Sequence, residues 1–235
     1  MRHLIIASTS TVYNGKPLDY IMEALAVLFK DTKEVLFIPY ARPSGISHDV
    51  YTDKIKQAFK SIEKSVVGIH EFESPEEAIK QAKGIYVGGG NTFVLVNQLY
   101  KNNCINALKL AVDNGTPYIG TSAGSNICGL TMRTTNDMPI VYPPSFNTLG
   151  FVPFNINPHY LDPDASSKHM GETRETRIKE FHKFNTQPVV GLREGSWLEV
   201  KNDSIQLKGT LHARIFEYNS EAYEIETGTY LNTLK

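Results

Sequence analysis

The chain has 235 residues, with 24 lysines and arginines against 25 aspartates and glutamates, and 41% of its residues are hydrophobic. This length suits one large domain or two small ones, and the composition is ordinary for a globular protein that dissolves in water. The balanced charge shows no basic bias of the kind that binds nucleic acid and no acidic tail. We therefore expect no nucleic acid among the partners.

The N-terminus and the cysteines bear on the compartment. The apolar run at residues 3–7 is too short for the apolar region of a signal peptide and far too short to span a membrane. The only cysteines are Cys104 and Cys128; both fall in predicted helices, and their spacing is not that of a metal site. We expect two reduced core thiols in a cytoplasmic protein with no membrane partner.

Strands and helices alternate through the first half of the chain, as short apolar runs and apolar residues at helical spacing indicate. Ser47 is a typical helix cap, and Ser74 is followed by Pro75 and Glu77, which together make a strong helix start. The predicted strands cover 3–8, 34–40, 65–70, 84–87 and 117–120, and the predicted helices cover 18–29, 48–62, a segment from 74, 92–101 and 105–114.

This alternation predicts an α/β fold with a mostly parallel sheet and helices on both faces. Sites in such sheets lie beyond the carboxyl ends of the strands. Residues 88–90 and Ser122 both follow predicted strands. We therefore expect them to meet at the same edge of the sheet.

The second half of the chain is less regular. Residues 131–161 are rich in Pro, Asn and Thr and are typical of a loop with short strands; such long irregular segments are often functional. A helix is expected at 172–184, and a hairpin turn at 201–203. Extra strands are expected at 188–192, 196–200, 203–207, 213–218 and 222–230. No linker interrupts the chain, so we predict a single domain, 1–235.

The segment Gly120-Thr121-Ser122-Ala123-Gly124 matches the G-x-S-x-G pattern of a nucleophile elbow. In such an elbow a strand turns abruptly into a helix, here expected to start near Asn126, so the flanking residues must be small. The serine then stands exposed at the end of the sheet, and the helix N-terminus offers N–H groups to a developing negative charge. A Gly/Ser-rich turn without chemistry has the same pattern, so the rest of the chain must decide.

A serine nucleophile needs a histidine within hydrogen-bonding reach. Among the seven histidines, His159 stands apart because it lies just past a short apolar strand that begins near Phe154. Others, such as His48, His169 and His182, lie in polar, surface-like contexts. His159 is therefore the candidate base.

Two carboxylates are candidates for orienting His159. Asp137 lies in a polar run that closes onto an apolar one, and Glu194 lies right after a predicted strand. Either could instead be a turn-forming acid with a solvated side chain. Because sites gather at strand ends, the position of Glu194 favours it as the hydrogen-bond partner, with Asp137 needed nearby.

The segment Gly88-Gly89-Gly90-Asn91 follows the predicted strand 84–87. It fails as a dinucleotide fingerprint because Phe93 stands where the third glycine should be, and it lacks the Lys-Ser/Thr of a phosphate-binding loop. It fits a source of backbone N–H groups for an oxyanion hole, since glycine allows a close approach of backbone to substrate.

Six segments taken together resemble the peptidase E family, the α-aspartyl dipeptidases. They occur in the order of that family and extend over essentially the whole chain. The segments are 87–93, 120–124, 133–141, 156–159, 171–175 and 194–197. The resemblance implies a flavodoxin-like α/β fold, related to class I glutamine amidotransferase domains.

The resemblance also implies an activity. It implies a serine peptidase that hydrolyses dipeptides with an N-terminal aspartate, has little activity on longer peptides, and uses neither a metal nor another cofactor. By motif, Ser122 is the nucleophile and His159 is the base, while both the Asp137-type and the Glu194-type positions have been assigned as third member. Gly89, Gly90 and Ala123 are then the expected sources of oxyanion-hole N–H groups.

The aspartyl carboxylate of such a substrate needs a cation, and we choose Arg174, because a guanidinium can grip a carboxylate with two hydrogen bonds. A surface ion pair of Arg174 with Glu172 or Glu175 is the alternative. Should Arg174 not serve, Arg193 or Lys168 come next.

Two rival functions stay open on the sequence. One is a related hydrolase of β-aspartyl or isopeptide bonds, like cyanophycinase, which a comparison of α-Asp-X with β-Asp-X hydrolysis would distinguish. The other is a ligand-binding module of the same fold without catalysis, in which a serine-reactive phosphonate would not label Ser122. The sequence leaves open whether the protein is a monomer or a homodimer.

Overall fold

The computed structural model describes residues 1–164, 166, 168 and 170–234. Its strands are β1 (His3–Ala7), β2 (Glu34–Ile38), β3 (Ser65–Gly68), β4 (Ile85–Val87), β5 (Tyr118–Thr121), β6 (Asn155–Pro158), β7 (Val189–Leu192), β8 (Ser196–Lys201), β9 (Ser204–Gly209), β10 (Ala213–Phe216) and β11 (Tyr223–Ile225). Its α-helices are α1 (Met22–Leu28), α2 (His48–Phe59), α3 (Pro75–Gln81), α4 (Thr92–Lys101), α5 (Cys104–Asp113), α6 (Ala123–Asn126) and α7 (Arg174–Phe181). Short 3₁₀ turns lie at Asp19–Ile21, Lys60–Ile62, Ile69–Glu71 and Met132–Thr134.

The larger sheet has the strand order β3-β2-β4-β5-β1-β8-β9. Its five strands from the first half of the chain are parallel, and β8 and β9 add an antiparallel hairpin at one edge. The order β3-β2-β4-β5 is the 2-1-3-4 order of flavodoxin-like sheets, with β1 in the place of the fifth strand. The predicted mostly parallel, flavodoxin-like sheet is therefore confirmed.

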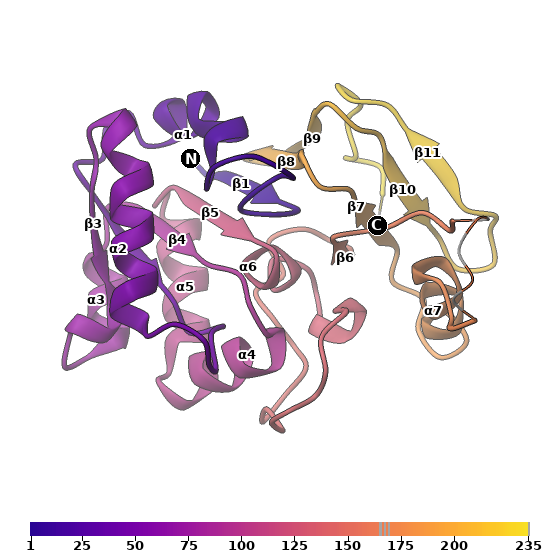
Figure 1. Cartoon of the computed structure of the whole chain (residues 1–235), viewed down its shortest axis with the longest axis horizontal. Coiled ribbons are helices and arrows are strands. Elements are labelled where there is room, and N and C mark those ends of the chain that lie inside the picture. Colours follow the sequence, from indigo (N-terminus) through magenta and orange to yellow (C-terminus); the bar gives the residue numbers. More distant parts are fainter. Residues whose placement is uncertain (165, 167, 169, 235) are drawn as a thin grey trace.

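Helices cover both faces of this sheet, because every parallel strand is apolar on both sides. Helices α1 and α2 pack on one face, and α3, α4 and α5 pack on the other (Figure 1). The strand residues that face α1 and α2 are Ile5, Ala7, Val35, Phe37, Tyr86 and Ile119. Those that face the other helices are Leu4, Ile6, Leu36, Ile38, Ile85, Val87 and Tyr118.

A second sheet, of order β11-β10-β7-β6, lies at the other end of the molecule together with α7 (Figure 1). Strands β6 and β7 are parallel, while β10 is antiparallel to both β7 and β11. The C-terminal strands predicted from the sequence are thus divided between two sheets. The single-domain expectation stays a prediction.

Several predicted boundaries shift for local reasons. The expected helix at 18–29 starts with a 3₁₀ turn, because Leu18 is left-handed with φ 63°. The expected helix at 172–184 is confined to α7. The expected strand at 222–230 shortens to β11, since the chain turns at Gly228, whose φ is 93°.

The elbow helix differs from the prediction. Helix α6 begins at Ala123, directly after Ser122, and ends at Asn126, whereas the sequence pattern predicts a start near Asn126. Cys128 therefore lies beyond the helix, although it and Cys104 are free, buried thiols as expected. No helix among the described residues is long and apolar enough to cross a membrane.

The packing of α6 on β4 gives a stability prediction. A Cβ atom at Gly124 would lie 2.2 Å from the carbonyl oxygen of Val87, so any side chain there must push α6 off the sheet. We expect Gly124→Ala to lower the free energy of unfolding by about 3 kcal/mol, the upper range for overpacking, as measured by urea denaturation.

Gly45→Ala is the matched control for Gly124→Ala. A Cβ at Gly45 meets nothing within 4 Å, and its φ is 89°, so only backbone strain of about 1 kcal/mol is expected. If the two variants lost the same free energy of unfolding, the contact between residue 124 and Val87 would not be the cause of the loss in Gly124→Ala.

Candidate active site

Ser122 stands at the turn from β5 into α6, with a strained backbone of φ 54° and ψ −112°. Backbone passes close to this turn on both sides, so the chain can make the turn only where the residues at these contacts are glycine. A Cβ at Gly120 would lie 2.2 Å from the carbonyl oxygen of Gly124, and one at Gly89 would lie 2.8 Å from the Cβ of Ser122. The small residues of the predicted elbow are thus required by contacts, and the serine hydroxyl faces the carboxyl edge of the sheet.

His159 and Glu194 follow the ends of two neighbouring parallel strands, β6 and β7, where Pro158 pairs with Leu192. His159 Nε2 lies 2.9 Å from Ser122 Oγ, and His159 Nδ1 lies 2.6 Å from Glu194 Oε1. An ionised carboxylate can only accept, so Nδ1–H donates to Glu194 and Nε2 accepts from the serine hydroxyl. The side chains of His159 and Glu194 are 37% and 49% exposed, so the row of three is open to a ligand.

Ser8, which follows β1, ties His159 and the second sheet to the larger sheet. Its buried hydroxyl accepts from the His159 backbone N–H at 2.9 Å and donates to the Leu192 carbonyl at 2.6 Å. His159 has a positive φ of 53°, an unfavourable conformation for a residue with a side chain, and this hydrogen bond holds it. No motif in the sequence marks Ser8 as a site residue; the only signal is a serine at the carboxyl end of a predicted strand.

Arg193 fixes the loop that carries Glu194. Its guanidinium donates to both carboxylate oxygens of Asp162, at 2.6 and 2.8 Å, and to both of Glu224, at 2.8 and 2.9 Å. It also donates to the carbonyl of His212 at 2.8 Å. These hydrogen bonds from Arg193 lower the pKa of Asp162 and of Glu224. Arg193 is therefore already neutralised and is a poor candidate for binding a substrate carboxylate.

The two glycines expected in the oxyanion hole differ. The N–H of Gly89, a buried residue, donates to the hydroxyl of Tyr51 at 3.1 Å. Gly89 is therefore not the free donor that the sequence predicts. Gly90 is partly exposed, and neither its N–H nor that of Ala123 has an acceptor among the described residues. Gly90 and Ala123 are thus the donors available beside Ser122.

Asp137 does not contact His159. Its Oδ2 accepts hydrogen bonds from the Thr92 N–H at 2.7 Å, the Thr92 hydroxyl at 2.6 Å and the Thr135 hydroxyl at 2.9 Å. The carboxylate thus sits at the N-terminus of α4, where a negative charge is favoured, and it joins the loop around Thr135 to the glycine segment before α4. Of the two carboxylates left open by the sequence, Glu194 is the one bonded to His159.

Arg174, the first residue of α7, lines a hollow of about 300 Å³ with residues such as Asp162 and Thr173. It forms no ion pair with any carboxylate among the described residues. The alternative partner Glu175 is instead bonded to Lys179 and Arg214. Partial burial lowers the pKa of Arg174. The charge of Arg177 lowers this pKa further, whereas the charge of Asp137 raises it. This cation is therefore available to an incoming carboxylate.

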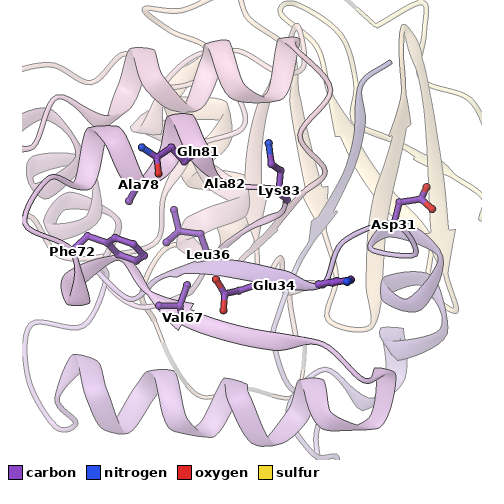
Figure 2. A pocket seen from close by; sticks show the side chains of 10 residues that line it. Asp31, Glu34, Leu36, Val67, Phe72, Ala78, Gln81, Ala82 and Lys83 are labelled. Atoms are coloured by element: carbon purple, nitrogen blue, oxygen red, sulfur yellow. The ribbon is translucent and has the colours of Figure 1, made fainter.

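The other residues and hollows considered for the site contribute no contact to Ser122, His159 or Glu194 among the described residues. Lys168 is exposed, and His169 lies outside the described residues. Among the described residues no three His, Cys, Asp or Glu side chains are grouped to hold a metal ion. Another hollow, of about 450 Å³, is bordered by Leu36, Phe72 and Ala78 (Figure 2). It also reaches residues that precede β2 and β4, so it lies toward the amino edge of the sheet and away from Ser122.

These distances define a class of protein. A serine, a histidine and a carboxylate joined in this order, at the carboxyl edge of an α/β sheet and beside two unpaired N–H groups, form the arrangement of a serine hydrolase.

Comparisons with known proteins define the family. The model of peptidase family S51 matches residues 4–208. Peptidase E of Streptomyces coelicolor is 44% identical over 232 residues, which are 99% of this chain and 94% of that protein. A probable alpha-aspartyl dipeptidase of Drosophila melanogaster is 42% identical over 227 residues, 95% of this chain and 93% of that protein. The chain belongs to peptidase family S51, and the resemblance drawn from six segments is confirmed.

Two solved structures share the fold. A putative peptidase E protein from Listeria monocytogenes EGD-e matches 90% of this chain and 100% of its own, with a TM-score of 0.68 and 20% identity. A peptidase from an acI-B1 actinobacterium matches 98% of this chain and 96% of its own, with a TM-score of 0.73 and 16% identity. At these identities the two structures support the fold alone.

The hydroxyl of Ser8 gives a prediction about positioning. Ser8→Ala leaves the partly buried N–H of His159 without its acceptor, which costs about 1 kcal/mol of folding stability. We expect kcat to fall by about tenfold to 100-fold with little change in KM, because a base displaced by a fraction of an ångström still allows binding. Ser61→Ala is the control, since that exposed hydroxyl donates only to Ala58 within its own turn. An unchanged kcat in Ser8→Ala would contradict this role.

The Arg193 cluster gives a prediction about acid stability. Asp162 and Glu224 have lowered pKa values when folded, so their contribution is present at neutral pH and is lost as the pH falls through those values. We expect Arg193→Met to lower the Tm at pH 7, and the gap to the wild type to narrow below about pH 4. Arg133→Met, whose guanidinium donates to the amide oxygen of Asn185, is the control. A gap that stays constant between pH 7 and pH 3 would exclude the linkage.

Proposed function

We propose that this chain hydrolyses dipeptides with an N-terminal aspartate through an acyl-enzyme on Ser122. The observation that carries the proposal is the hydrogen-bonded row Ser122–His159–Glu194 in a chain of peptidase family S51. The substrate class is supported by the 42% identity to a relative named a probable alpha-aspartyl dipeptidase.

The reaction proceeds in two halves. His159 Nε2 removes the proton of the Ser122 hydroxyl while the oxygen attacks the carbonyl carbon of the Asp-X bond. The protonated ring then gives that proton to the departing amine of X, and the C–N bond breaks. Water enters, loses a proton to His159, and attacks the ester; the serine takes the proton back as the free aspartate leaves. Glu194 keeps Nδ1 protonated, so Nε2 is free to act as the base at the start of each half-reaction.

The negative charge on the carbonyl oxygen needs fixed donors. Gly90 and Ala123 are the donors that we propose, because their N–H groups lack acceptors among the described residues and flank Ser122. Gly89 contributes indirectly. The hydroxyl of Tyr51 accepts a hydrogen bond from the Gly89 N–H, and this bond holds the segment that contains Gly90. One oxyanion donor contributes roughly 3–4 kcal/mol to the transition state.

Arg174 is proposed to bind the aspartyl carboxylate of the substrate. It is partly buried and lacks a carboxylate partner among the described residues, so an incoming carboxylate supplies the missing charge. Asp137 is proposed as a positioning residue, since its three hydrogen bonds to Thr92 and Thr135 fix the loop across from α7.

The substrate class can be tested directly. Purified enzyme is assayed with Asp-Leu, Glu-Leu, Asp-Leu-Gly and β-Asp-Leu at equal concentrations. We expect turnover of Asp-Leu to exceed that of the other three by at least about tenfold, since one methylene or a missing contact is worth roughly this much. Equal or faster turnover of β-Asp-Leu would overturn the proposal.

The catalytic roles give a second prediction. Ser122→Ala and His159→Ala are each expected to reduce kcat by about 10⁴-fold or more, because members of such a triad act as a unit. Glu194→Gln keeps the shape of the row, but its amide N–H can donate to Nδ1 and leave the ring proton on Nε2, so we expect kcat to fall by about 10⁴-fold as well. Circular dichroism and Tm measurements check that the variants fold, and loss of labelling of Ser122→Ala by a fluorophosphonate checks the nucleophile. Near-wild-type turnover in either alanine variant would exclude the triad.

Arg174 gives a third prediction. Arg174→Lys keeps the charge but loses the planar fork, so kcat/KM for Asp-Leu should fall by at least about tenfold. Asn-Leu, which carries no side-chain charge, should lose much less. The measurement is the ratio of the two specificity constants, with Arg133→Lys as control. An unchanged ratio in Arg174→Ala would mean that another cation binds the aspartate.

A further inference from the structure

A cavity of about 690 Å³ is lined by Glu194, and its other lining residues have no contact with Ser122 or His159 among the hydrogen bonds of the described residues. Its walls include Tyr13, Tyr20, Trp197 and Lys208. Because Glu194 lines this cavity and is also bonded to His159, the cavity is one side chain away from the catalytic base.

The strand order points the leaving group toward this cavity. Gly90 follows β4 and Ala123 follows β5, whereas β1 and then β8 continue the sheet in the opposite direction. With the carbonyl oxygen held on the β4 side, the departing amine must face His159 Nε2, which lies over β1 and the end of β7. The residue attached to that amine thus extends toward β8, where the cavity opens.

Pairing across the sheet gives the distance that the substrate must cover. Thr121 pairs with Ala7, Ala7 with Trp197, and Trp197 with Lys208. These four residues form one row across four neighbouring strands, so about 14 Å separates the Cα atoms at its two ends. The lysine stem and one amino-acid residue together can span this gap.

The cavity combines a free cation with three aromatic rings. The ammonium group of Lys208 has no ion pair or hydrogen bond within the described part of the chain, although the residue is partly buried. Tyr20 and Trp197 meet edge to face, with ring centroids 6.1 Å apart. Tyr13 is 91% exposed at the rim, so its ring is available to a ligand.

We propose that this cavity binds the leaving residue X of the dipeptide, with its α-carboxylate on Lys208 and an apolar side chain against Tyr13 and Trp197. This inference rests on the proposed function. The carboxylate of X is three bonds from the carbonyl carbon that is attacked, so a dipeptide presents it at the mouth of the cavity. A longer peptide places a neutral amide there instead, and the cation is left unpaired. Lys208 thus favours dipeptides over longer chains.

The test compares substrates with and without that carboxylate. Lys208→Met is assayed with Asp-Leu and with the C-terminal amide of Asp-Leu, beside Lys201→Met, which removes a charge from the far end of the same hairpin. We expect Lys208→Met to raise KM for Asp-Leu by about fivefold to tenfold and to leave the amide within about twofold, as a partly exposed charge pair allows. Lys201→Met should change neither substrate.

The side-chain contact is tested separately. Tyr13→Ser removes an exposed ring without touching the core, and it should lower kcat/KM for Asp-Leu by about threefold relative to Asp-Gly. Equal effects of Lys208→Met on the acid and the amide, or none on either, would overturn the role of Lys208 while the proposed function stands. A wild-type enzyme that hydrolyses no Asp-X dipeptide would overturn both proposals.

Discussion

The site depends on one constraint: three backbone segments meet at the carboxyl edge of the sheet with no room for side chains between them. Ser122 takes its strained φ of 54° because Gly120 and Gly124 allow α6 to lie against β5 and β4. Gly89 then passes beside the serine Cβ. A Cβ at any of these glycines would move the nucleophile away from its partners. The strain at Ser122 is therefore maintained by the packing of the whole sheet, and the hydroxyl keeps one direction.

The triad joins two sheets. The serine belongs to the larger sheet, while His159 and Glu194 come from the ends of β6 and β7 in the smaller one. Such a division would allow the base to drift relative to the nucleophile, but Ser8, at the end of β1 in the larger sheet, is hydrogen-bonded to His159 and Leu192 at the ends of β6 and β7. Arg193, the residue before Glu194, adds a second anchor through its ion pairs with Asp162 and Glu224. Alignment of the base is thus built into the fold rather than left to the substrate.

The sequence predicted those parts of the site that depend on strand ends. Ser122, His159 and Glu194 each follow a short apolar run, and parallel strands bring such ends together. The place of Asp137 could not be predicted, because it depends on the path of a long loop and on Thr92 and Thr135, which no local pattern links to it. Gly89 was misjudged for a similar reason: its N–H is taken by Tyr51, a residue on a helix whose packing the sequence does not specify. Long-range contacts decide these cases, whereas periodicity decides the strands.

Charge at the two ends of the site explains how a short substrate can be selected. Among the described residues, Arg193 is neutralised by two carboxylates, whereas Arg174 and Lys208 have no acidic partner. An unpaired cation that is partly buried is unfavourable, which is why we propose that each binds a carboxylate of the substrate. Arg174 is the first residue of α7, and Lys208 lies on β9. A dipeptide with an acidic first residue carries two carboxylates at its two ends, and it is the shortest peptide that pairs both cations while placing its single peptide bond at the serine.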